Sequence, residues 1–515
     1  MIRKAAWTCV LSMSLVSVLL ASASSSRAAV RAAKVFGDHM VLQQELPIAV
    51  WGWADAGEQV SVELSGSKAI ETKAGADGAW RVDLPAVKAD GKPHTLTIKG
   101  SSNTVPFKDV LLGEVWLASG QSNMARGTGI QDETPGVRVW LRSRQKRHGP
   151  IPTPNDYGDE TVCTWSPATP DALQGAPQTV QRNGKLGPHR SYGEVAYVFA
   201  RTIHEQLKVP VGVMNIAWGG STAKAWTPKP EIEKEYPFGK PAEGGYIGHR
   251  DGLMYQSQLL PIVPLTIRGV IWYQGEDDGR NKKYAEDFGN LIRSWRKLWN
   301  QPEMPFYFVQ IAQTTYASGM LNVWTDQIKI QEGMPNTGLA VSNDIYDNGG
   351  TIGADVKTYT DRRDANSPDN GLPVAGSSNP HPPHKDLVAR RLAQIALVKA
   401  YGQAERPIFG PIYESHKVDG DKVVVKLKYA YDGLKTSDSK APIWFQLSDG
   451  TMDGRKMKFH NAEAKITAKD TIEVTSAKVK SPKYVRFAWN TSARHNLVNS
   501  GGLPAVSFTT DDKSR

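Results

Sequence analysis

The run Val110-Leu-Leu-Gly-Glu-Val-Trp-Leu-Ala118, followed at once by Ser119-Gly-Gln-Ser-Asn-Met124, decides the fold. The first nine residues carry a single charge, which is typical of a strand buried on both faces in a parallel sheet. Small and polar residues directly after such a strand indicate a tight turn. Open α/β sheets bind ligands at the carboxyl ends of their strands, so we predict a site beyond this strand.

Similar patterns continue toward the C-terminus. Further apolar runs predict buried strands at 209–217, 267–273 and 305–312. Apolar residues at helical spacing predict helices at 194–207, 284–299 and 387–401. Because strands alternate with helices, we expect a parallel α/β sheet with helices on both faces.

The segments on either side alternate apolar and polar residues, as half-buried strands do. Before the sheet, strands are predicted at 60–64 and 95–98 in a small sandwich; after Pro407, at 422–428, 471–475 and 484–489. The C-terminal pattern fits a second β module or the partner half of the first. Residues 344–380 lack periodicity, which predicts a long functional loop or disorder.

The N-terminus predicts a secretory signal peptide. Arg3 and Lys4 precede an apolar run at 5–21, and Ala21-Ser-Ala23 offers a cleavage site. We therefore expect a secreted or periplasmic protein, and no later run is long enough to span a membrane. The predicted units are 1–29 (signal peptide), 30–107 (N-terminal β module), 108–403 (catalytic domain) and 404–515 (C-terminal β module).

Cysteine content and charge exclude some classes of protein. Cys9 would leave with the signal peptide, so Cys163 would stand alone and form no intrachain disulfide. The net charge is +10, but the basic residues are scattered, which argues against a nucleic-acid groove. The sequence does not determine an oligomeric state.

Four polar clusters lie where the predicted sheet would place a site. Ser122 follows the first strand, and Trp218-Gly-Gly-Ser-Thr222 follows the second. Gln274 and Glu276 follow the third, while Asn379-Pro-His-Pro-Pro-His-Lys385 opens the last helix. Each cluster alone is ordinary turn chemistry. Together they offer a nucleophile, backbone donors for an oxyanion and, in His381 or His384, a base.

These residues resemble the motifs of a known family. Gly113 to Met124, Trp218 to Thr227, Gly269 to Glu276 and the segment around His381-Pro382 are similar to blocks of the sialate O-acetylesterase family, a branch of the SGNH/GDSL hydrolases. The resemblance covers about 34–511. It implies a flavodoxin-like α/β sheet flanked by N- and C-terminal β-sandwich modules, a substrate that is an acetylated carbohydrate, and no metal or organic cofactor.

The resemblance also implies roles for individual residues. Ser122 would be the nucleophile and His381 the general base. The N–H groups of Ser122 and of Gly220 (or Gly219) would hold the oxyanion together with the Gln274 amide.

The chain departs from the family at the acid that orients the histidine. An Asp usually stands two or three residues before the His, where this chain has Ser378 and Asn379, and 347–378 resembles an insertion. Three hypotheses follow. Glu276 or Asp344 orients His381; a Ser–His dyad operates; or activity is lost and the protein only binds carbohydrate. A lipid or peptide hydrolase is a further alternative, although no apolar lid sequence supports a lipase.

Overall fold

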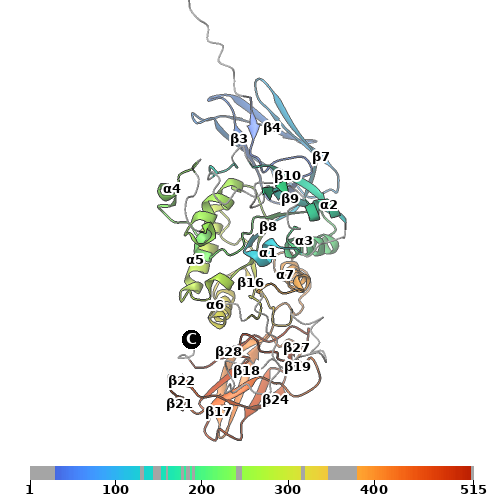
Figure 1. Cartoon of the computed structure of the whole chain (residues 1–515). Helices are drawn as coiled ribbons and strands as arrows, with labels where there is room; N and C mark the ends of the chain where they lie inside the picture. Colours follow the sequence, from blue (N-terminus) through green and yellow to red (C-terminus); the bar gives the residue numbers. More distant parts are fainter. Residues whose placement is uncertain are drawn as a thin grey trace, which may run out of the picture.

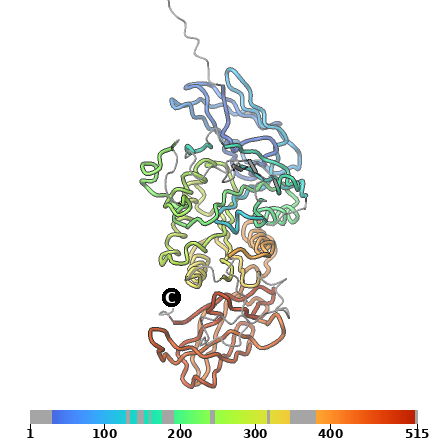
Figure 2. The backbone as a smooth tube through the Cα atoms, viewed as in Figure 1, coloured from blue at the N-terminus to red at the C-terminus, as the bar shows by residue number. Residues whose placement is uncertain are grey.

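The computed structural model describes residues 29–127, 133–142, 152–157, 161–175, 179–180, 186–187, 192–238, 240, 246–314, 319–345 and 380–511. The predicted signal peptide, apart from Ala29, and the predicted insertion at 347–378 lie outside these residues. Three blocks follow one another along the molecule, with β-sheets at both ends and an α/β block between them (Figure 1). The backbone trace shows the C-terminal block meeting the middle block at one end (Figure 2).

One long strand, β8 (Thr104–Gly120), connects the first two blocks. Its first half pairs antiparallel with β7 (His94–Lys99) of the N-terminal block, where Thr97 lies opposite Pro106. Its second half pairs with the parallel strands of the middle block. Burial follows the sequence: exposed residues occur until Lys108, and every residue from Val110 to Gly120 is buried. The predicted boundary at 107/108 therefore falls inside a strand.

The middle block contains a mixed sheet with a parallel centre. Its strand order is β10-β9-β13-β8-β14-β15-β16, and only the β10–β9 pair along this path is antiparallel. The strands are β9 (Thr134–Arg142), β10 (Cys163–Ala168), β13 (Val211–Asn215), β14 (Gly269–Tyr273), β15 (Phe306–Val309) and β16 (Thr337–Ala340). The predicted strands at 209–217, 267–273 and 305–312 are confirmed as β13, β14 and β15, each shorter than predicted.

Helices cover both faces of this sheet, as predicted. One face packs against α3 (Glu194–Leu207) and α7 (Lys385–Lys399), and the other against α5 (Tyr284–Leu298) and α6 (Met320–Gly333). Successive β8 side chains alternate between the two cores: Trp116 lies with α3, and Leu117 with α5. Shorter helices are α1 (Ser122–Ala125), α2 (Pro170–Gly175) and α4 (Ile232–Glu235).

The N-terminal block shares its core with the α5 side of the middle block. Its strands form one sheet of order β1-β3-β6, while β2, β4, β5 and β7 extend from β8. They are β1 (Arg31–Ala32), β2 (Val41–Gln43), β3 (Ile48–Trp53), β4 (Gln59–Leu64), β5 (Ile70–Lys73) and β6 (Ala79–Leu84).

The C-terminal block has a core of its own and is a second module, not the partner half of the first. Its two main sheets have the orders β17-β18-β25-β24 and β23-β20-β26-β28. A cavity of about 450 Å³ is lined by Trp444, Phe445 and residues of the adjoining strands. The strands are β17 (Ile412–Asp419), β18 (Lys422–Lys428), β19 (Leu434–Thr436), β20 (Phe445–Ser448), β21 (Met452–Asp453), β22 (Lys456–Met457), β23 (His460–Asn461), β24 (Glu463–Ala468), β25 (Thr471–Thr475), β26 (Tyr484–Phe487), β27 (Leu497–Asn499) and β28 (Phe508–Thr509).

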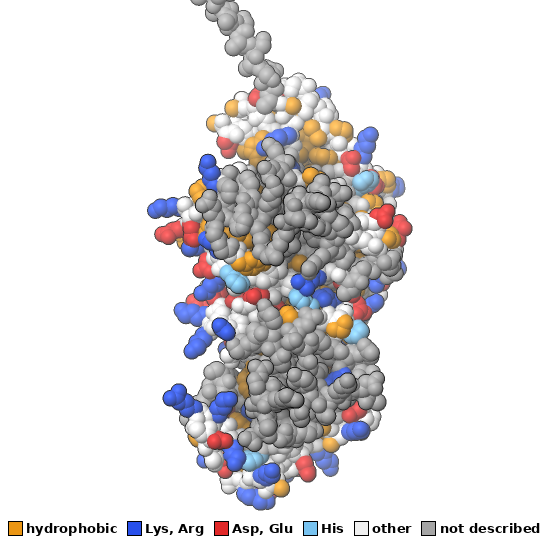
Figure 3. All heavy atoms as spheres, viewed as in Figure 1, with side chains coloured by type: hydrophobic (Ala, Val, Ile, Leu, Met, Phe, Trp, Pro, Cys, Tyr) orange, Lys and Arg blue, Asp and Glu red, His pale blue; other side chains and the backbone are white. Residues whose placement is uncertain are grey.

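Two expectations from the sequence concern the distribution of surface charge and the presence of a membrane-spanning helix. On the face shown in Figure 3, Lys and Arg side chains are interspersed with Asp and Glu. No helix within the described ranges is both long and apolar enough to cross a membrane.

Glu114 is the one charge in the buried half of β8, and it is only 1% exposed. Arg268 donates to it at 2.7 and 3.0 Å, Gln44 at 2.8 Å and the Tyr401 hydroxyl at 3.0 Å. Burial alone would raise the pKa of this carboxyl, but the Arg268 pair and the glutamine donors hold the pKa below its ordinary value. One carboxylate thereby joins the N-terminal module, the sheet and the end of α7.

Removing this charge is expected to destabilise the protein substantially. Glu114→Gln leaves the largely buried Arg268 guanidinium with only the half-exposed Glu45 carboxylate, 3.4 Å away, as a counter-charge, and breaking a buried ion pair costs about 3 kcal/mol or more. The exposed Arg81–Asp83 pair supplies the control, because Asp83→Asn should cost less than about 1 kcal/mol. Urea unfolding followed by tryptophan fluorescence measures both, and equal small losses would contradict this role for Glu114.

Candidate active site

Ser122 lies at the turn where β8 ends and α1 begins. Gly120 has φ +124°, and a Cβ there would lie 2.3 Å from the Tyr273 carbonyl oxygen, so a side chain does not fit. The Gln121 N–H donates to that same carbonyl at 2.9 Å, which fixes the turn against β14. Ser122 is therefore the first residue of α1, half-buried, at the carboxyl end of the central strand.

The structure brings His381 to Ser122 across 259 positions of sequence. The imidazole Nε2 lies 2.8 Å from the Ser122 Oγ. The other candidate, His384, occupies the N-cap position of α7 and makes no side-chain capping hydrogen bond there. Of the two histidines that sequence left open, His381 is the one in hydrogen-bond contact with the serine.

Arg126 contacts the other ring nitrogen of this histidine and was not predicted. Its Nη1 lies 3.2 Å from the His381 Nδ1. A guanidinium can only donate, so a hydrogen bond here makes Nδ1 the acceptor, and in a neutral imidazole the ring proton is then on Nε2. Nothing in the sequence near Arg126 signals this role, because the contact forms only when residues 126 and 381 meet in the fold.

Glu276 lies in a short 3-10 turn after β14 and is 1% exposed. Its Oε1 accepts a hydrogen bond of 2.6 Å from the Asn123 amide, which also donates to the Pro380 carbonyl at 2.8 Å. Its Oε2 is buried and has no hydrogen-bond partner among the described residues. Burial raises the pKa of this carboxyl to about 7. Glu276 thus reaches the histidine segment through Asn123 and the backbone, not through the imidazole.

Asp344 lies at the other end of the predicted loop. Both of its oxygens accept from Arg391 of α7, at 2.7 and 2.6 Å. Neither Asp344 nor Glu276 hydrogen-bonds to His381 within the described part of the chain. Their predicted role in orienting the histidine stays a prediction, and the Arg391 pair gives Asp344 a structural function of its own.

The predicted oxyanion donors, Gly219, Gly220 and Gln274, differ in their surroundings. A Cβ on Gly219 would lie 3.4 Å from the Ser122 Cβ, so bare backbone faces Ser122, and Gly220 has φ +71°. Gln274 is fully buried and its amide nitrogen donates to the Ser221 carbonyl at 3.0 Å and to Asp278 at 2.6 Å. The amide is thereby directed at the loop after β13 and at the turn after β14. All three assignments stay predictions.

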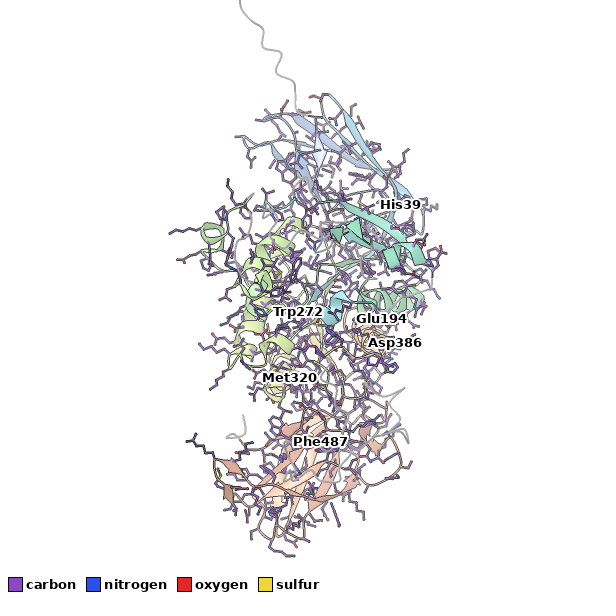
Figure 4. The ribbon with its side chains drawn as sticks, in the orientation of Figure 1. His39, Glu194, Trp272, Met320, Asp386 and Phe487 are labelled. Atoms are coloured by element: carbon purple, nitrogen blue, oxygen red, sulfur yellow. The ribbon has the colours of Figure 1, made fainter. Side chains whose placement is uncertain are left out.

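Other groups that sequence singled out lie apart from this chemistry. Trp272 is in the interior between the sheet and α5, packed against Trp226 and Trp295 (Figure 4). Burial raises the pKa of the Cys163 thiol to about 12, so this thiol stays protonated. Among the described residues, no group of three or more His, Cys, Asp or Glu is arranged to hold a metal ion.

Comparisons with known proteins match this chain to carbohydrate acetylesterases. A family model described as "Carbohydrate esterase, sialic acid-specific acetylesterase" matches residues 112–358. The sialate O-acetylesterase of Homo sapiens is 26% identical over 443 residues, covering 78% of this chain and 76% of its own length. That of Rattus norvegicus is 25% identical over 550 residues, covering 93% and 94%. A crystal structure of a novel carbohydrate acetylesterase from Xanthomonas citri aligns with a TM-score of 0.73 and 26% identity, covering 94% of this chain and 100% of that one.

Glu276 makes stability depend on pH. The folded carboxyl titrates near pH 7 and the unfolded one near 4.5, so the stability that its neutral form contributes is complete below pH 4.5 and is lost as the pH rises toward 7. This difference corresponds to about 3 kcal/mol. Glu276→Gln stays neutral, so the variant should gain stability relative to wild type between pH 5 and 8 in thermal melts. The exposed Glu63→Gln is the control, and a difference that does not change with pH would contradict the assignment.

Proposed function

This chain belongs to the sialate O-acetylesterase family of carbohydrate esterases, and we propose that it removes O-acetyl groups from carbohydrates through an acyl-enzyme intermediate. One observation carries the mechanism: the Ser122 Oγ and the His381 Nε2 lie 2.8 Å apart at the carboxyl end of the central strand. The comparisons support an acetylesterase, and the contact supports serine and histidine as the groups that react.

In the first half-reaction Ser122 Oγ attacks the acetyl carbonyl carbon while His381 Nε2 takes the hydroxyl proton. The carbonyl oxygen becomes an oxyanion that accepts from the backbone N–H groups of Ser122 and of Gly219 or Gly220, and each such donor contributes about 3 kcal/mol in comparable enzymes. The bond between the acetyl carbon and the sugar oxygen then breaks, and the sugar hydroxyl leaves with the proton from His381. Water, deprotonated by His381, attacks the acetyl-serine and releases acetate.

The contact between Arg126 and His381 sets a condition for this reaction. A base must offer an unprotonated Nε2, so the ring proton has to be on Nδ1 when Ser122 attacks. Arg126 occupies Nδ1 as a donor in the resting structure. Attack therefore requires Arg126 to release Nδ1, which makes the contact a feature of the resting state.

Two finer predictions belong to the same proposal. Counted in chain order, β8, β13, β14, β15 and β16 have the spatial order 2-1-3-4-5, which supports a flavodoxin-like core of the SGNH type. The charged and apolar segments at 3–23 support export to a secreted or periplasmic location.

Replacing the nucleophile tests the function directly. We expect the purified protein to hydrolyse p-nitrophenyl acetate and to release acetate from acetylated glycans. Ser122→Ala should lower kcat at least about 1,000-fold, since loss of a serine nucleophile costs up to about 10⁶ in kcat. Ser415→Ala, on an exposed edge of β17, is the matched control and should keep full activity. If wild type and Ser122→Ala are equally inactive yet still bind glycans, the protein is a catalytically impaired carbohydrate-binding protein instead.

Asp344→Asn tests the orienting acid. Loss of an acid that orients a catalytic histidine lowers kcat about 10,000-fold. Because Asp344 is engaged by Arg391, we expect the variant to keep kcat within about threefold of wild type. Its unfolding midpoint should fall as the ion pair weakens. A loss of several orders of magnitude in kcat, with the fold intact by circular dichroism, would assign Asp344 to His381 after all.

A further inference from the structure

A group of polar and aromatic side chains adjoins Ser122 from elements that the proposed mechanism does not use. The Tyr246 hydroxyl donates to the carbonyl of Gly219, the residue whose backbone faces the serine. The Tyr246 ring lies against Gly220 and Gly248, and a Cβ on Gly248 would be 2.6 Å from the ring. This aromatic side chain is half-buried, and its hydroxyl is hydrogen-bonded to the loop that faces Ser122.

His249 and Asp277 form a chain of contacts with Tyr246 and Gln121. The His249 ring meets the Tyr246 ring edge to face, with centroids 5.2 Å apart, and its Nε2 lies 3.6 Å from the Asp277 Oδ1. The other Asp277 oxygen accepts from the Gln121 amide at 3.1 Å, and Gln121 immediately precedes Ser122. Asp277 is thus fixed in place by the residue next to the nucleophile.

This arrangement contributes little to the stability of the fold. The His249 side chain is 54% exposed, and ion pairs at such exposure stabilise proteins by roughly 0–1 kcal/mol. The arrangement instead has the composition of a sugar subsite. A carboxylate accepts hydrogen bonds from neighbouring hydroxyls, an imidazole donates or accepts one, and an aromatic ring packs against the apolar face of a pyranose.

We propose that Tyr246, His249 and Asp277 form the subsite for the sugar that carries the acetyl group, and that this sugar is neutral. The Asp277 carboxylate selects hydroxyl donors and repels an acidic sugar at this position. The assignment rests on the proposed esterase function for its place in catalysis. It names which side chains determine specificity, a role that is separate from attack by Ser122.

Kinetics on three acetate esters test the subsite. The substrates are an O-acetylated neutral methyl pyranoside, an O-acetylated sialic acid methyl glycoside and p-nitrophenyl acetate, which has no sugar. Wild type should have its higher kcat/KM on the neutral glycoside of the two sugars. In Asp277→Asn and His249→Ala, kcat/KM for the neutral glycoside should fall about 10-fold relative to that for p-nitrophenyl acetate, mainly through KM. A preference for the sialoside overturns the neutral assignment, and an unchanged ratio overturns the subsite.

His39 provides the matched control. It is similarly exposed and pairs with Asp109 in the N-terminal module, away from the site (Figure 4). His39→Ala should leave all three rates unchanged. Thermal melts of each variant identify any loss of fold, and Asp277→Asn keeps an oxygen for the Gln121 hydrogen bond.

A binding measurement separates the subsite from the esterase function. Cellotriose binding to Ser122→Ala, followed by saturation-transfer NMR, should be lost when Asp277→Asn is added and kept when His39→Ala is added. Binding that depends on Asp277 in a protein without esterase activity would overturn the proposed function and support the subsite. If the protein is an esterase but its cellotriose binding does not depend on Asp277, the proposed function is supported and the subsite is overturned. If it shows neither esterase activity nor cellotriose binding, the proposed function and the subsite are both overturned.

Discussion

The placement of Ser122 depends on a single strand that serves two sheets. The first half of β8 completes the N-terminal module, and its second half is the central parallel strand that ends next to Ser122. A strand buried on both faces has no tolerance for an unpaired charge, so Glu114 needs the donors that surround it. Those donors come from the N-terminal module, from the start of β14 and from the end of α7. The three regions are consequently positioned relative to one another by one carboxylate.

Much of the central sheet can be predicted from sequence because burial on both faces leaves a direct pattern. Residues 194–207 and 422–428 form a helix and a strand with the predicted ends, since each has a clear period and ends at polar or turn residues. The edge strand β10 and its neighbour β9 were missed. They are partly exposed, and Thr-Pro-Gly at the start of β9 reads as a turn. The α6–β16 pair was also missed, and β16 spans only four residues.

The site shows the same division between local and long-range information. Ser122, Gly219 and His381 follow strand ends or precede a helix, so their proximity could be predicted from topology alone. The contact of Arg126 with His381, the Asn123 bridge from Glu276 to Pro380 and the engagement of Asp344 by Arg391 could not. Each of these depends on side-chain directions between segments more than 40 residues apart, about which a one-dimensional pattern carries no information.

The length of β8 has a consequence for how the chain is made. Synthesis proceeds from the N-terminus, so the first half of β8 finds its partner β7 as soon as it emerges. The second half ends at Gly120, whereas its neighbours β13 and β14 begin at Val211 and Gly269. Residues 111–113 already have a parallel partner in β2, but residues 114–120, which end in the turn at Ser122, wait for about 90 further residues before β13 exists. During that interval this strand, which is buried in the finished protein, is exposed and prone to aggregate. A chain that is kept unfolded until it is complete avoids this hazard.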